Sequence, residues 1–260
     1  MQRPPDSRRP PILFQLPTYE WINRVNQKHK ELVALRPSAE QHERLIRWTE
    51  VGFAHATLLV EGVGVSKEEV ARVAYGPSRD GSQLSDGEQA IARMLTAVRL
   101  LDSFARSSGA TAALTPSLLL RLHQALTSAS AGLRTGAGEP TRPVKPPAGE
   151  HVPVLLETTC QWFAAESFTE LNPIEQAAIV LLRLTELQPF EVANAAVALL
   201  AATLFTVRVG LPPIIISPDT VPSYRAAVEE GYTANTKPMV ELLAETVDRS
   251  LGKLIEIVRG

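Results

Sequence analysis

The feature that most constrains the fold is an uncharged, apolar run from Val192 to Val207. This run is 16 residues long, which is short of the roughly 20 residues that a helix needs to span a bilayer. A helix that is apolar on every side has no face to present to water, so it packs inside a protein. The sequence therefore predicts a buried helix at the centre of a bundle.

The composition favours a helical fold around that run. Of the 260 residues, 45% are hydrophobic and 21% are charged, as in ordinary globular proteins. Alanine and leucine dominate, and β-branched alternation is scarce, so we expect an all-α fold. The net charge is −2 and Lys and Arg are spread along the chain, so nothing indicates a nucleic-acid partner.

The chain has one cysteine, Cys160, which excludes an intrachain disulfide and a cysteine metal cluster. We expect it to be a small buried apolar residue. Four histidines have no spacing that is typical of a metal site; they are His29, His42, His55 and His151. The first dozen residues hold three arginines and four prolines without the apolar core of a secretory signal. We therefore expect a cytoplasmic protein that does not contact membranes.

Amphipathic segments separated by turn signals predict the other helices. Ser66 and Glu69 have capping-box spacing, Thr115 and Pro116 form a helix entry, and Asn172 is a helix cap. The expected helices span residues 18–33, 38–62, 66–73, 87–105 and 115–126. Another helix is expected to include residues 162 and 163, a further one begins at 173 and ends just before 188, and the closing helices lie within 224–258. The predicted parts are a Pro/Arg-rich flexible arm at 1–17, an N-terminal helical region at 18–110 and a core with closing helices at 111–260.

A short motif overlaps the start of the apolar run. Its residues are Gln188, Pro189, Phe190, Glu191, Val192, Ala193, Asn194, Ala195, Ala196, Val197, Ala198 and Leu199. The segment resembles the H-x-F-x-D/E-G-N-G/K-R-x-x-R signature of the Fic (Fido) adenylyltransferases, a family of helical-bundle proteins. Pro189, Phe190 and Asn194 match, whereas the residues that do the family's chemistry are replaced.

The resemblance implies a role for each replaced position. In the family the histidine is the general base, the acidic residue holds Mg²⁺, and the glycines and arginines cradle the phosphates of ATP. Gln188 stands at the base position and Val192 at the metal-ligand position. The two glycine positions hold Ala193 and Ala195, and the two arginine positions hold Ala196 and Leu199.

These replacements remove the family's chemistry. A glutamine amide has no useful proton affinity near neutral pH, so Gln188 cannot act as a base. A phosphate nest uses backbone conformations that glycine adopts more cheaply than alanine. Glu191 offers a carboxylate one residue before the metal position, but on a helix that shift rotates it by about 100°. We therefore expect no catalytic residue and no metal at this motif.

An upstream segment, Thr57-Leu58-Leu59-Val60-Glu61-Gly62, resembles the family's inhibitory motif S/T-x-x-x-E-G/N. In relatives with this motif the glutamate points at the second motif arginine and obstructs the γ-phosphate of ATP. That arginine position holds Leu199 here. We therefore expect Glu61 either to be a leftover or to make another contact. A glycine that ends an amphipathic helix also explains this pattern.

Two further regions resemble parts of the Fic fold. Residues 131–134 resemble the turn that leads into the family's flap, a β-hairpin that pairs with the target protein. Residues 134–147 hold two glycines and four prolines, which predicts a short, irregular flap because proline cannot donate to a strand ladder. His123 lies on an otherwise apolar helix, so we expect a hydrogen-bonded core residue.

The sequence thus favours a Fic-fold pseudoenzyme that is inactive as an adenylyltransferase and acts as a scaffold, regulatory or binding protein. The alternative is a nucleotide-binding protein, or a nucleotidyl or phosphate-group transferase, that uses Glu191, Asn194 and the helix N-terminus in the same cleft. ATP and Mg²⁺ are the family's ligands, and we expect neither to bind. A protein partner is consistent with either hypothesis. The sequence does not indicate its identity or the oligomeric state.

Overall fold

The computed structural model describes residues 20–77, 84–127, 132–138 and 145–260. The expected arm at 1–17 lies outside these residues, as does part of the expected flap. The described residues form eleven α-helices and no strand, which confirms the all-α prediction. The helices are α1 (Glu20–Ala34), α2 (Ala39–Val60), α3 (Lys67–Tyr75), α4 (Asp86–Ser108), α5 (Pro116–Thr127), α6 (Val152–Phe163), α7 (Glu166–Thr169), α8 (Pro173–Leu187), α9 (Asn194–Val207), α10 (Val221–Gly231) and α11 (Lys237–Arg259).

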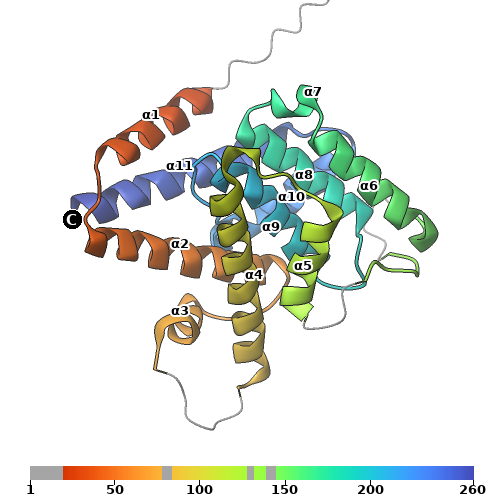
Figure 1. Cartoon of the computed structure of the whole chain (residues 1–260), viewed down its shortest axis with the longest axis horizontal. Coiled ribbons are helices and arrows are strands. Elements are labelled where there is room, and N and C mark those ends of the chain that lie inside the picture. The colour runs from red at the N-terminus through yellow and green to blue at the C-terminus, as the bar shows by residue number, and fades with distance from the viewer. Residues whose placement is uncertain (1–19, 78–83, 128–131, 139–144) are drawn as a thin grey trace, which may run out of the picture.

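Helix α9 is the buried centre that the apolar run predicts. Every residue from Ala196 to Thr206 is buried. Helix α8 packs along α9, and α2, α4 and α5 contact it from other sides. Figure 1 shows α9 in the middle of the molecule, with α4 in front of it. Because the motif residues lie at the start of α9, this packing fixes the position of the candidate site.

Local capping signals set several helix starts. Ser38, Ser66, Ser85 and Asn172 each form a capping box with the side chain three residues later, which confirms the starts predicted at Ser66 and Asn172. The predicted end of α4 at residue 105 is wrong by one turn. The helix continues to Ser108 and ends where Gly109 adopts a φ of 57°, a conformation that glycine takes readily.

The N-terminal helices and the closing helices share one core. Helix α1 packs against α11, and Lys28 of α1 pairs with Asp248 of α11 at 2.8 Å (Figure 1). Helix α2 contacts α4, α9 and α11. The buried apolar residues of the described chain form one continuous cluster. The predicted regions 18–110 and 111–260 are therefore packed together.

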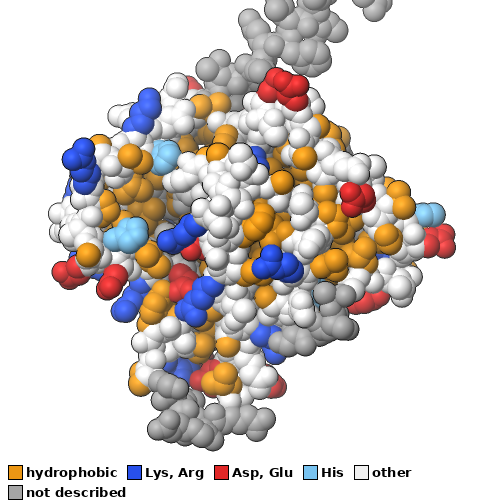
Figure 2. Space-filling view, viewed as in Figure 1, with side chains coloured by type: hydrophobic (Ala, Val, Ile, Leu, Met, Phe, Trp, Pro, Cys, Tyr) orange, Lys and Arg blue, Asp and Glu red, His pale blue; other side chains and the backbone are white. Residues whose placement is uncertain are grey.

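The surface agrees with the even charge distribution of the sequence. Figure 2 shows Lys and Arg side chains scattered over this face of the molecule instead of collected in one stripe. Among the described residues, no helix combines the length and the apolar character that crossing a bilayer requires.

Candidate functional site

The motif residues line a cavity at the junction of α8 and α9. Helix α8 ends at Leu187, and Gln188 turns the chain in the left-handed conformation with a φ of 44°. The cavity has a volume of about 340 Å³. Its lining includes Glu61, Arg134, Ala137, Gly138, Thr185, Gln188, Phe190, Glu191, Val192, Ala193, Asn194 and Ala195.

The side chain of Asn194 closes the loop between the two helices. Its Nδ2 donates to the carbonyl oxygen of Phe190 at 2.7 Å, and its Oδ1 accepts from the Phe190 N–H at 3.0 Å. Ala193 lies inside this loop with a φ of 62°, a conformation that costs an L-residue about 1 kcal/mol. Both ends of the Asn194 amide thus stabilise the loop.

Phe190 and His123 join this loop to the core. Phe190 is 1% exposed, and its ring stacks on the His123 ring at 4.1 Å with an interplanar angle of 4°. The expectation that His123 is a core residue is confirmed, but its ring nitrogens make no hydrogen bond of ordinary geometry with the described residues. Its ring is held in the core by the stack on Phe190. Burial lowers the pKa of His123, and the Val192 backbone partly opposes that effect.

Arg134 anchors the segment that covers the loop. Its side chain is 2% exposed and donates to four backbone carbonyl oxygens. These belong to Leu187 at 3.2 Å, Gln188 at 2.5 Å, Gly136 at 2.7 Å and Pro147 at 2.7 Å. The backbone N–H of Arg134 also donates to the Pro189 carbonyl oxygen at 3.0 Å. The guanidinium therefore holds the two sides of the predicted flap region against the motif.

The flap region has no strand among residues 132–138 and 145–148, which agrees with the predicted irregular flap. The remaining flap residues lie outside the described part of the chain. Glu191 contacts this region, where its Oε1 accepts from the Thr135 N–H at 3.3 Å. The carboxylate that the alternative hypothesis assigns to nucleotide binding therefore points at the flap backbone.

The end of helix α2 positions Glu61. Gly62 has a φ of 86°, and its N–H donates to the Leu59 carbonyl oxygen while the Val63 N–H donates to that of Leu58. This pair of bonds is a Schellman motif, which glycine permits at the position after the cap. Thr57 is buried, and its hydroxyl donates to the Phe53 carbonyl oxygen at 2.8 Å. Of the inhibitory-motif residues, Thr57 and Gly62 thus shape the helix end, and Glu61 projects from it.

The Glu61 carboxylate reaches the N-terminus of α9. Its Oε2 accepts from the Ala196 N–H at 2.7 Å, so the glutamate makes another contact and is not a leftover. The first N–H groups of a helix have no partner within the helix and attract an anion. Ala196 and Leu199, at the positions of the two family arginines, are 1% and 0% exposed. Glu61 therefore binds the backbone of α9 and does not make the arginine contact that the resemblance implies.

Burial raises the pKa of the Glu61 carboxyl, although hydrogen bonds from the Ala196 and Ala193 backbone oppose this. A raised pKa in the folded protein stabilises the fold below the unfolded pKa, and this contribution is lost as the pH rises through the folded pKa. We therefore expect the stability advantage of the wild type over Glu61→Gln to shrink between pH 4 and pH 7. Urea unfolding of both proteins across this pH range measures the difference in their free energies of unfolding. A difference that grows with pH would contradict the prediction.

Two replaced motif positions in this cavity differ in exposure. Val192, at the metal-ligand position, is 60% exposed, and Gln188 is 7% exposed. Among the described residues no three His, Cys, Asp or Glu side chains come together. Cys160 is buried as predicted, and burial raises the pKa of its thiol to about 12.

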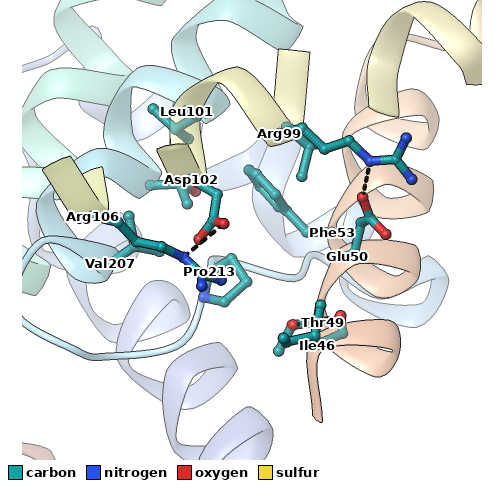
Figure 3. A pocket seen from close by; sticks show the side chains of 12 residues that line it. Ile46, Thr49, Glu50, Phe53, Arg99, Leu101, Asp102, Arg106, Val207 and Pro213 are labelled. Atoms are coloured by element: carbon teal, nitrogen blue, oxygen red, sulfur yellow. Dashed lines mark hydrogen bonds and ion pairs between the residues drawn. The ribbon is translucent and has the colours of Figure 1, made fainter. Parts of the chain in front are cut away.

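A second hollow, which the sequence analysis did not find, lies between α2, α4 and α9 and has a volume of about 110 Å³ (Figure 3). Figure 3 shows Phe53 in its wall and two ion pairs around it. Glu50 pairs with Arg99 at 2.5 Å, and Asp102 pairs with Arg106 at 2.9 Å. The charges that line this hollow thus compensate one another.

Comparison with known proteins shows a likeness in part of the sequence and in the fold. Residues 113–206, from just before α5 to the end of α9, match the model of the Fic/DOC family. Protein adenylyltransferase fic-1 of Caenorhabditis elegans is 31% identical over 113 residues, which cover 44% of this chain and 22% of that protein. Protein adenylyltransferase Fic of Drosophila virilis is 24% identical over 106 residues, which cover 41% of this chain and 22% of that protein. The match therefore spans about a fifth of the length of these relatives.

Solved structures extend the likeness to most of the chain. A Fic domain containing signaling protein from Bacteroides thetaiotaomicron has a TM-score of 0.79 and 17% identity, with 91% of this chain and 98% of that chain covered. Fic-1 of C. elegans (residues 134–508) has a TM-score of 0.78 and 22% identity, with 91% of this chain and 71% of that chain covered. At such identities the likeness is one of fold. Residues 113–206 thus resemble the Fic/DOC family, and most of the chain has the fold of the solved Fic structures.

Proposed function

We propose that this protein is a Fic-fold pseudoenzyme, which transfers no AMP and acts as a scaffold, regulatory or binding partner of another protein. The observation that carries the proposal is the contact between the Glu61 carboxylate and the Ala196 N–H at 2.7 Å. The protein's own anion thereby holds the helix end that would receive a phosphate. The relatives named above are protein adenylyltransferases, but the match spans about a fifth of their length, so the proposal of inactivity rests on the residues of the cleft.

The lining of the cavity does not fit a magnesium triphosphate. Its acidic side chains, Glu61 and Glu191, already accept from backbone N–H groups and would repel phosphate. Arg134 is the basic residue among the lining residues named above, and its donors are engaged by four carbonyl oxygens. Valine at position 192 cannot bind a metal, because Mg²⁺ takes oxygen ligands. The lining residues therefore supply neither the metal ligand nor the free cation that nucleotide transfer requires.

Nucleotide binding tests the proposal directly. A ligand at 100 times its dissociation constant stabilises a protein by about 2.7 kcal/mol, which for a chain of this size raises the Tm by about 5 to 10 °C. We expect no Tm shift with millimolar ATP, GTP, CTP or UTP, with or without Mg²⁺. A saturable shift with one nucleotide would favour the alternative function. Its loss in Glu191→Gln or Asn194→Ala would then assign the binding residues.

The transfer reaction is the second test. We expect no labelled protein when the chain is incubated with radiolabelled ATP and a cell lysate. Gln188→His is expected to restore nothing, because the catalytic groups of a site act as a unit and each lost stabilising donor costs about 10² to 10³ in rate. Glu61→Gly is expected to unmask no transfer and to change stability by about 1 kcal/mol.

Protein adenylyltransferase fic-1 of C. elegans serves as the positive control in the same lysate. A labelled band that depends on the wild-type chain would contradict the pseudoenzyme proposal. A band that appears only with Gln188→His would show that the rest of the catalytic site is intact.

A further inference from the structure

The C-terminal end of α9 carries an arginine without a counter-charge. Arg208 is half-buried and caps α9. Its Nη1 donates to the Ala112 carbonyl oxygen at 2.8 Å, and its Nη2 donates to Gln176 Oε1 at 2.7 Å. The guanidinium carbon lies 4.2 Å from the centre of the Phe205 ring. All of these partners are neutral, and no carboxylate of the described chain forms an ion pair with Arg208.

A neighbouring glutamine fixes the orientation of this guanidinium. Gln176 is 2% exposed, and its Nε2 donates to the carbonyl oxygens of Phe168, Thr169 and Leu171 at 3.0 to 3.1 Å. The amide can therefore present only its oxygen to Arg208. The guanidinium is half-buried and has no counter-ion among the described residues, and desolvating an unpaired charge even in part is costly. Burial accordingly lowers the pKa of Arg208.

Arg208 lies in the wall of a hollow with a volume of about 460 Å³. The hollow is formed by the segment after α4, the end of α6, the connection from α7 to α8 and the end of α9. Its walls are mainly apolar, and they include Ala112, Phe163, Ala164, Leu171, Pro173 and Val209. A mainly apolar hollow with a few fixed polar groups, here including the charged Arg208, is typical of a small-molecule site.

The hollow of Figure 3 provides a contrast within the same protein. Its two arginines, Arg99 and Arg106, are each paired with an acidic residue of the same hollow. A ligand anion there would have to displace a carboxylate. At Arg208 no such competitor is present among the described residues, so a ligand anion would supply the missing counter-charge.

We propose that the hollow at Arg208 binds the carboxylate of a small amphipathic organic acid. The carboxylate pairs with the guanidinium, and the hydrocarbon part lies against the apolar walls. A monoanion matches the single positive charge, whereas a phosphate dianion would leave charge uncompensated. The hollow lies at the opposite end of α9 from Glu61, about 20 Å away for a helix of 14 residues. This site is therefore separate from the motif cavity and does not depend on the proposed pseudoenzyme role.

Matched acids and amides test the charge requirement. The probes are octanoate and 3-phenylpropanoate, compared with octanamide and 3-phenylpropanamide by titration calorimetry at pH 7. We expect at least one acid to bind at least about tenfold more tightly than its amide, because a hydrogen bond to a charged group contributes more than one to a neutral group. Arg208→Gln is expected to abolish this preference. Arg106→Gln, which removes a paired arginine of the other hollow, is expected to leave it unchanged.

A second variant keeps the test decisive if Arg208→Gln does not fold. Ala164→Leu retains Arg208 and narrows the hollow. We expect this variant to lose binding of the acid while its Tm stays near that of the wild type. Equal affinity for acid and amide, or acid binding that survives Ala164→Leu, would overturn the proposal. Binding of inorganic phosphate without binding of either acid would overturn the assigned ligand class.

Discussion

Replacing Arg134 by methionine is expected to destabilise the protein by about 3 to 5 kcal/mol. The change leaves the carbonyl oxygens of Leu187, Gln188, Gly136 and Pro147 without their donor. A buried polar group that loses its partner costs about 1 to 3 kcal/mol, and several carbonyl oxygens lose theirs here. For a chain of this size we expect the Tm to fall by about 6 to 20 °C.

The matched control is Arg183→Met on helix α8. Arg183 is exposed and pairs with Glu186 across one turn, so its loss is expected to cost about 0.5 kcal/mol or less. Arg134→Lys should be intermediate, because an ammonium has three donors and lacks the planar fork. A Tm for Arg134→Met equal to that of Arg183→Met would show that water satisfies the freed carbonyl oxygens.

Replacing Phe190 by alanine is expected to cost about 3 to 5 kcal/mol of stability. The ring is 1% exposed, and its removal leaves a cavity beside His123, on which it stacks. Urea unfolding monitored by circular dichroism measures the loss. The adjoining helices should keep their structure, because α8 and α9 pack on each other along their length.

Two variants separate the ring from the loop. Phe190→Leu keeps most of the buried volume and should cost less than Phe190→Ala. Val192→Ala lies in the same loop but at a side chain that is 60% exposed, so we expect it to change stability by about 0.5 kcal/mol or less. A large loss for Val192→Ala would mean that the loop, and not the aromatic stack, is the sensitive element.

The features of the fold that depend on short stretches of sequence, such as helix burial and helix starts, could be predicted. The absence of charge from Val192 to Val207 is sufficient to predict a buried central helix, because burial of a uniformly apolar helix requires no knowledge of its neighbours. The starts of α3 and α8 follow from capping boxes within four residues. The end of α4 was predicted too early because Gly109, and not the fading apolar pattern, stops the helix.

The contacts of the site depend on residues that are distant in the chain. Glu61 and Ala196 are 135 positions apart, so the sequence indicated that the glutamate lacks its arginine but not what replaces it. The anchoring role of Arg134 could not be predicted, because its acceptors are backbone carbonyl groups, which leave no pattern of side chains in the sequence. The environment of Arg208 could not be predicted either, since the lack of a counter-charge is known only once its spatial neighbours are known.

The bonds between Asn194 and Phe190 bear on what the matching motif residues do in this chain. The motif positions that match the family include Phe190, which fills the core, and Asn194, which closes the loop. The positions that differ are those whose family residues handle protons, metal and phosphate. If the chain transfers no AMP, as proposed above, these two matching side chains still maintain the shape of the loop between α8 and α9.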